Sequence, residues 1–249
     1  MPNIHSNISF ALVNIPVVMN PVIKNNDTSF NQIHNKCHHR INYIKYCPYC
    51  KKNVSETEIV KGYEFEKENY LIFSKEEINK LKPEQEKEID VIAFINIDEI
   101  DPRYFEKSYL LKTENKSKAY NLFYEALSKT KKVALAKTVL GSKFYYCILR
   151  IIKEGIILTT LYFEEEIIIP QEKISSEVNK KELDLAIQLI DSLSAKFDPT
   201  KYKDEYQDNI KKAINDKLNG KSIKGTKKKS KKQVNDLLMA LEKSLNSKK

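Results

Sequence analysis

Glycine is scarce in this chain of 249 residues: there are five, and none of them lies in a glycine-rich phosphate-binding loop. The motifs His-Glu-x-x-His and Gly-x-Ser-x-Gly, which are typical of zinc proteases and serine hydrolases, are also absent. The acidic run Glu164–Glu166 could suggest a nuclease metal site, but it follows a strand-like pattern. We interpret it as a solvated strand end, because charge runs are usually on the surface. The sequence therefore favours a non-enzymatic protein over an enzyme such as a nuclease.

Long hydrophobic runs are also lacking. The longest, Ile8–Met19, is interrupted by Ser9, Asn14 and Pro16, and it is shorter than the roughly 20 residues that a membrane-spanning helix needs. The N-terminus has neither the basic start nor the cleavage site of a signal peptide. We therefore expect a cytoplasmic protein without a membrane partner.

The formal net charge of +9 is unevenly distributed along the chain. Residues 1–216 hold equal numbers of basic and acidic side chains, whereas residues 217–249 hold eleven lysines against Asp236 and Glu242. A basic tail on a neutral body indicates contact with a polyanion, since each lysine near a phosphate releases a bound counterion. The alternative interpretation is a tail that only improves solubility.

Residues 1 to about 170 show mainly the period-two hydrophobic alternation of strands. Two helices are predicted within this region. One begins with the capping box Ser74-x-x-Glu77, and the other covers about residues 117–128, with Leu122, Ala126 and Leu127 facing inward. Strand patterns occur at Ile8–Leu12, Val91–Ile95, Val133–Val139, Tyr145–Leu149 and Ile156–Phe163, the last following Gly155 as in a hairpin.

After Pro170 the pattern becomes helical. A helix is predicted over 182–197, ended by Asp198-Pro199, and a second ends at Asn219-Gly220. Residues 221–232 have the composition of a solvated linker. A terminal apolar stripe then indicates a short helix that docks on a partner or packs on its own core; it contains Val234, Leu237, Leu238, Leu241 and Leu245.

Four possible metal ligands lie close together in the sequence. His34-x-x-Cys37 is followed by Cys47-Pro-Tyr-Cys50, and a Cys-x-x-Cys turn presents two thiolates to one ion. Four protein ligands leave no open coordination position, so we expect a structural Zn²⁺ held by His34, Cys37, Cys47 and Cys50. His38 and His39 are alternative ligands, and reduced structural thiols or a redox disulfide are alternative roles for the cysteines. Cys147, within an apolar strand pattern, is expected to be an inert buried thiol.

Four ordered segments of the chain resemble the prokaryotic Ku family. Ile8–Val17 looks like its opening strand, and the other three are similar to later family blocks; they are Glu58–Glu66, Glu99–Phe105 and Leu189–Tyr206. The resemblance extends from about residue 8 to 220. Two departures concern the family's usual Trp-Lys-Gly, which reads His5-Ser6-Asn7 here, and its usual glycine, which is Ala11. Both departures are expected to be modest losses that affect the local packing of the N-terminal strand.

This resemblance implies an α+β, mainly β fold, with a Ku-type β-barrel core, peripheral helices and a helical, lysine-rich C-terminal extension. It divides the chain into a core over 1–197, a ligase-recruiting helical region over 198–220, and a basic linker with a terminal helix over 221–249. It also implies a ring-shaped homodimer that binds double-stranded DNA ends during non-homologous end joining. A DNA ligase, in bacteria typically of the multidomain polymerase-ligase type, is the implied partner.

The candidate binding residues follow from the same resemblance and from the charge distribution. Those expected to face DNA from the ring are Arg40, Lys45, Lys137 and Lys143, with Lys227, Lys228, Lys229, Lys231 and Lys232 contacting DNA beyond it. Those expected to bind the ligase are Tyr206, Ile210 and Ile214. The alternative function is a zinc-ribbon nucleic-acid-binding accessory factor in transcription or replication.

Overall fold

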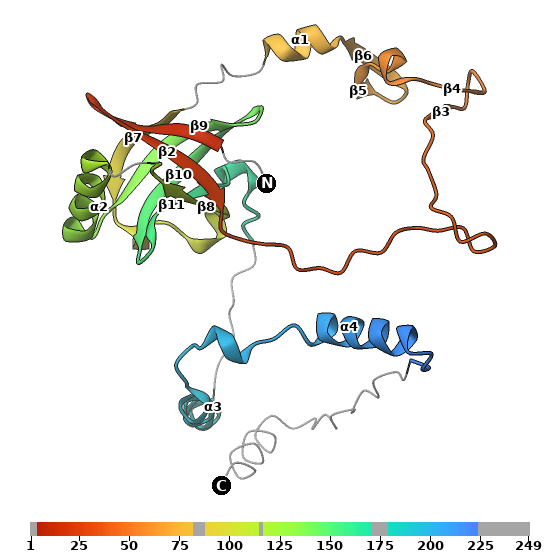
Figure 1. Ribbon diagram of the computed structural model, residues 1–249. Coiled ribbons are helices and arrows are strands. Elements are labelled where there is room, and N and C mark those ends of the chain that lie inside the picture. Colours follow the sequence, from red (N-terminus) through yellow and green to blue (C-terminus); the bar gives the residue numbers. More distant parts are fainter. Residues whose placement is uncertain (1–3, 82–87, 115–116, 171–178, 224–249) are drawn as a thin grey trace. The chain divides into compact units, whose positions relative to one another are not determined.

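The computed structural model describes residues 4–81, 88–114, 117–170 and 179–223. The chain divides into two compact units (Figure 1). The first contains residues 1–25 and 32–169, and the second contains residues 26–31 and 170–249. Five of the candidate DNA-binding lysines, residues 227–229, 231 and 232, and the predicted terminal helix lie outside the described residues.

The first unit is built around a closed barrel of seven strands, which confirms the predicted barrel core and mainly β character. The strands follow one another around the barrel in the order β1 (Ile4–Phe10), β2 (Val13–Pro21), β8 (Phe105–Lys112), β11 (Gly155–Leu161), β10 (Lys143–Ile152), β9 (Val133–Leu140) and β7 (Glu88–Ile95). Each of the predicted strand patterns overlaps one of these strands.

The barrel is closed by a parallel pairing between β1 and β7, whereas the neighbouring pairs are antiparallel. Parallel strands cannot be joined by a tight turn and need a long connection. Between β2 and β7 the chain makes such a connection over residues 22–87. The candidate metal ligands lie within this connection, so the barrel's topology places them on a long excursion.

Cross-strand pairs of apolar side chains fill the barrel. Ile8 lies opposite Ile15, Leu111 opposite Ile156, and Leu149 opposite Leu158, and all six side chains are completely buried. Burying each such side chain contributes about 1.5–3 kcal/mol. Cys147 is also buried, and this burial raises its pKa to about 12, so the thiol stays protonated at neutral pH.

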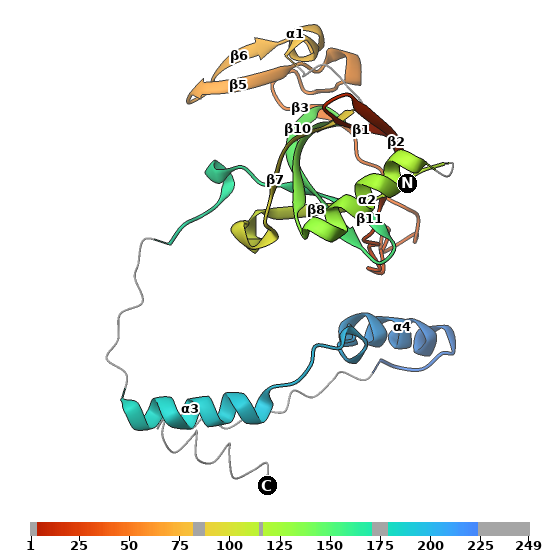
Figure 2. The same ribbon diagram turned by 90° about the vertical axis from the view of Figure 1, so that its left-hand side faces the viewer.

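Helix α2 (Lys118–Thr130) packs against the barrel (Figure 2) through Phe123 and Leu127. The ring of Phe123 stacks on Phe10 of β1, with ring centroids 4.9 Å apart. The prediction that Leu122 faces inward was wrong, because its side chain is 68% exposed. The helix is rotated so that the larger aromatic ring of Phe123 fills the core position.

Ala11 lies in the turn between β1 and β2 rather than within a strand, which corrects the expectation of a packing change. Its φ is +50°, a left-handed conformation that costs a residue with a Cβ roughly 1 kcal/mol more than glycine. Alanine in this turn is therefore locally strained. Leu12, the next residue, is fully exposed.

The excursion contains short elements that bury little. They are β3 (Tyr46–Cys47), β4 (Lys52–Asn53), β5 (Lys61–Glu66), β6 (Asn69–Phe73) and α1 (Lys75–Lys80). The predicted capping box is confirmed: Glu77 N donates to Ser74 Oγ at 3.1 Å, and Ser74 N donates to Glu77 Oε2 at 2.8 Å. The local sequence is therefore sufficient to begin α1.

The second unit contains α3 (Lys180–Leu193) and α4 (Glu205–Leu218). Helix α3 begins two residues earlier and ends four residues earlier than predicted, because Asp198 caps a separate 3₁₀ turn over Pro199–Lys201. Phe197 therefore lies outside the helix, where it stacks on Tyr202 at 5.6 Å between ring centroids. Among the described helices, none is both long enough and apolar enough to span a membrane.

Candidate functional site

The first candidate ligand pair lies in a small turn within residues 32–41. Ile33 and Arg40 form a β-bridge, and His34 N donates to the carbonyl oxygen of His39 at 2.8 Å. Within this turn His34 Nδ1 lies 3.1 Å from Cys37 Sγ. His38, which follows Cys37, has a left-handed backbone with φ of +56°. The backbone thus folds one histidine and one cysteine toward each other.

The second pair lies in the turn that joins β3 to β4. Cys47 pairs with Lys52 across this two-stranded ladder, and Cys50 N donates to Cys47 Sγ at 3.4 Å. Hydrogen bonds from the backbone and the side chain of Cys50 lower the pKa of Cys47, and the side-chain hydrogen bond with Cys47 raises the pKa of Cys50. Cys47 is therefore the more readily ionised thiol of the pair.

The two turns have the same arrangement of residues. Each has two ligand-type side chains three residues apart, followed by a left-handed residue, His38 in the first turn and Lys51 in the second. Over the part of the chain that the structure describes, however, no three His, Cys, Asp or Glu side chains gather as a metal-binding group. The structure thus forms each half of the predicted site and does not bring the halves together. Zinc binding stays a prediction.

Two of the four described DNA-binding candidates already have acidic partners. Lys45 Nζ lies 2.6 Å from a carboxylate oxygen of Glu56, and this contact lowers the pKa of Glu56. Lys137 Nζ, on β9, lies 3.2 Å from Asp90 on β7. Sequence reasoning missed both acids, although Asp90 precedes a recognisable strand pattern.

Arg40 and Lys143 make no ion pair with any described residue. Lys143 begins β10, directly after the turn at Gly141, whose φ of +66° suits a glycine. Of the candidate cations on the β9–β10 hairpin, Lys143 therefore makes no ion pair with a described residue, and Lys137 is paired with Asp90. Arg40 lies in the first ligand turn and is exposed.

The candidate ligase-binding side chains lie on α4. Tyr206 is 70% exposed, Ile214 is exposed, and Ile210 is half-buried. The intervening Gln207 is buried and faces residues 27 and 28: its Oε1 accepts from Thr28 N at 3.0 Å and from Thr28 Oγ1 at 2.9 Å. By helical spacing, Gln207 lies on the same face of α4 as Ile210 and Ile214, three and seven residues further on, and it anchors this face, whereas Tyr206 stays accessible. A contact across 179 positions leaves no periodic signal in the sequence.

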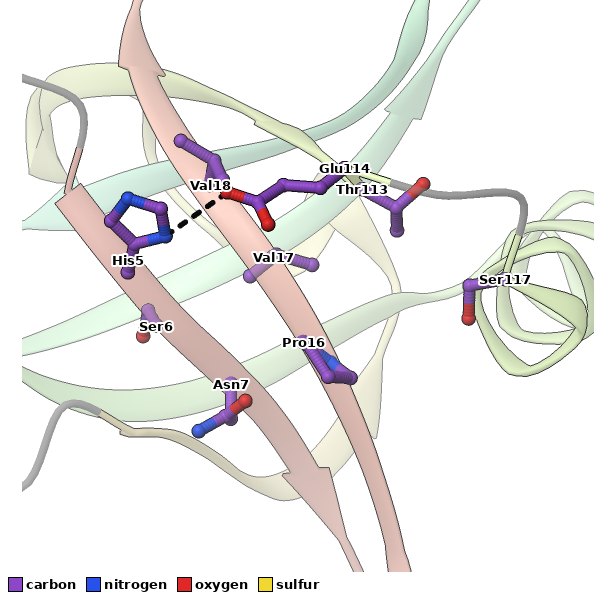
Figure 3. Close-up of a pocket in the computed structure, with 9 residues that line it drawn as sticks. All are labelled: His5, Ser6, Asn7, Pro16, Val17, Val18, Thr113, Glu114 and Ser117. Carbon is purple, nitrogen blue, oxygen red and sulfur yellow. Dashed lines mark ion pairs between the residues drawn. The ribbon is translucent and has the colours of Figure 1, made fainter.

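Two pockets open on the barrel unit. The first, of about 360 Å³, is formed by β1, β2 and residues that precede α2. Its titratable groups are His5 and Glu114, whose side chains form an exposed ion pair at 3.4 Å (Figure 3). The second, of about 550 Å³, is almost wholly apolar and lies beside α2.

Comparison with protein families matches residues 9–185 to the β-barrel domain of Ku70/Ku80. The chain belongs to the Ku family. The match begins in β1 and ends in α3, so it contains every barrel strand, helix α2 and the long excursion. Family membership thus accounts for the closed barrel and for the order of the four resembling segments.

Three bacterial Ku relatives, each named a non-homologous end joining protein, align with 96% of this chain. The protein from Lachnoclostridium phytofermentans is 38% identical, with 93% of its own length covered. Those from Desulfitobacterium hafniense and Bacillus subtilis are 39% and 38% identical, with 85% and 79% of their lengths covered. The similarity therefore includes α4 as well as the barrel.

Proposed function

We propose that the protein binds the ends of double-stranded DNA in non-homologous end joining, as a ring-shaped homodimer that does not read base sequence. The observation that carries this proposal is the Ku family match over residues 9–185, together with relatives named for end joining. It favours end binding over the alternative of a zinc-ribbon accessory factor. The proposal assigns the protein a binding role without catalysis.

The charge distribution supports sequence-independent binding. The body is neutral, and its candidate cations lie on a hairpin and a loop, where they can meet phosphates but carry no base-reading geometry. A ring holds DNA by enclosing it, so a few phosphate contacts suffice. Lys137 can exchange Asp90 for a phosphate, because an exposed ion pair contributes only about 0–1 kcal/mol.

Ligase recruitment is assigned to α4. Its exposed Tyr206 and Ile214, together with the half-buried Ile210, form an apolar stripe on a helix that Gln207 anchors to Thr28. Such a stripe fits a hydrophobic groove on a partner protein. The lysines beyond residue 220 would instead strengthen DNA binding through their positive charge, which salt screens.

A structural zinc ion remains part of the proposal. The donor set of three cysteines and one histidine suits Zn²⁺, and residues 32–53 include no buried side chain that could fold them around a core. Joining the two similar turns through His34, Cys37, Cys47 and Cys50 would contribute folding free energy to this segment. The ion would have a structural role.

Topological trapping tests the ring. Protein is loaded on linear DNA that carries biotin at both termini, and streptavidin then blocks the ends. We expect the complex to survive a wash in high salt, which removes phosphate contacts, and to dissociate once a nuclease cuts the DNA. If blocking the ends left dissociation unchanged, the protein would not encircle DNA.

A further inference from the structure

Residues 32–53 contain aromatic and positively charged side chains and have no buried residue. None of these residues is buried, and Tyr43, Tyr46 and Tyr49 are all exposed. The segment contains five cations and no aspartate or glutamate: Lys36, Arg40, Lys45, Lys51 and Lys52. A chain segment with no core of its own and interleaved aromatic and basic residues has the composition of a nucleic-acid surface.

Ion pairs neutralise only part of this charge. Lys45 pairs with Glu56, and Lys52 pairs with Glu58 at 3.3 Å. Lys36, Arg40 and Lys51 make no ion pair with any described residue. The remaining positive charge is complementary to a polyanion.

Tyr49 is the most exposed of the three tyrosines, at 94%, and it lies at the tip of the turn between β3 and β4. The turn is held by the hydrogen bond from Cys50 N to Cys47 Sγ and by one from Val54 N to the carbonyl oxygen of Lys45 at 2.9 Å. Tyr43 is bound through its hydroxyl to Gln32, whereas the hydroxyl of Tyr49 makes no hydrogen bond with any described residue. The backbone of this turn is therefore held by hydrogen bonds, and the ring of Tyr49 is exposed to solvent.

An exposed aromatic ring can stack only on a base whose own face is uncovered. Inside a duplex the neighbouring base pairs cover both faces, so free faces occur at the terminus and on unpaired overhang bases. A protein that binds DNA ends meets both. We propose that Tyr49, with Lys51 beside it, stacks on an unpaired base at the DNA terminus and makes the β3–β4 turn a binding site for single-stranded overhangs.

This inference rests on the proposed end-binding function, and three DNA probes separate the two. They are a blunt duplex, the same duplex with a short 3′ thymidine overhang, and the same duplex with an abasic overhang that keeps the phosphates but lacks bases. We expect the thymidine overhang to bind more tightly than the abasic one, by about fivefold to a hundredfold, as expected for stacking on one base. We also expect 2-aminopurine in the overhang to lose fluorescence on binding.

Tyr49→Ala should abolish both effects, and Tyr49→Phe should keep them, since stacking needs the ring and not the hydroxyl. Tyr63→Ala, at an exposed tyrosine of β5, is the matched control and should behave like the unchanged protein. Blunt-duplex affinity should be the same in the unchanged protein, Tyr49→Phe and Tyr63→Ala, and an unchanged circular dichroism spectrum should show that Tyr49→Ala is folded.

Equal affinity for the thymidine and abasic overhangs would overturn the inference, as would an overhang preference that survives Tyr49→Ala. A change of oligomeric state in Tyr49→Ala without DNA would assign this tyrosine to a protein interface instead, and would equally refute it. Failure of the unchanged protein to bind any of the duplexes would refute the proposed function, whatever Tyr49 does.

Discussion

The hydroxyl of Tyr120 joins α2 to two barrel strands, and removing it should destabilise the barrel. The hydroxyl donates to the carbonyl oxygen of Leu111 at 2.8 Å and accepts from Ile156 N at 2.9 Å. Leu111 and Ile156 are buried partners across β8 and β11. Burial also raises the pKa of Tyr120, so the hydroxyl stays protonated and can donate.

Tyr120→Phe leaves both backbone groups without their partner. Each buried polar group left unsatisfied costs about 1–3 kcal/mol, so for two groups we expect a loss of about 2–6 kcal/mol in the free energy of unfolding. In a domain of this size, that corresponds to a fall of roughly 4–24 °C in Tm. Urea denaturation followed by circular dichroism, at one fixed protein concentration, should show a lower midpoint with an unchanged slope.

Tyr124→Phe is the matched control. Its hydroxyl donates to one carbonyl oxygen, that of Ile152, at 3.1 Å, so its removal should cost only about 1 kcal/mol. If Tyr120→Phe lowered the free energy of unfolding by no more than Tyr124→Phe does, the two hydrogen bonds of Tyr120 with β8 and β11 would not add to stability. The argument from their geometry would then be refuted.

The remaining predictions concern the proposed functions of three segments. Replacing Cys47 and Cys50 with Ser should lower the zinc content from one ion per subunit to none and increase amide exchange over residues 32–53; a content near zero in the unchanged protein would refute the site. Replacing Ile210 and Ile214 with Asp should abolish stimulation of the ligase while DNA affinity stays the same; unaltered ligation would remove α4 from recruitment. Deleting residues 221–249 should weaken DNA binding most at low salt and flatten its dependence on salt, and an unchanged slope would limit the tail to solubility.

Local patterns in the sequence predicted most of the fold. The capping box at Ser74 and the hairpin at Gly155 depend on neighbouring residues, and both are present in the structure. Errors arose where a choice depended on distant packing. The sequence could not show that Phe123 rather than Leu122 meets Phe10, or that Asp198 begins a separate turn instead of ending a long helix.

The candidate site was predictable in its residue types and less so in its contacts. The spacing of His34, Cys37, Cys47 and Cys50 predicts one four-ligand site; over the described residues the structure forms its two halves as separate turns, and the complete site stays a prediction. The acid Asp90 beside Lys137 depends on strand register, and strand register is set by the whole barrel. The anchoring of α4 by Thr28 was likewise invisible, because the two residues meet only through the tertiary fold.

Dependence on a free DNA end is the central claim, and a direct comparison of linear and closed circular DNA tests it. The two DNA molecules should have equal length and sequence, and binding should be measured at the same salt concentration. The account predicts stable retention on linear DNA and weak, salt-sensitive binding to the closed circle until a restriction enzyme opens it. Equal affinity for the closed circle and the linear molecule would contradict end binding by a ring.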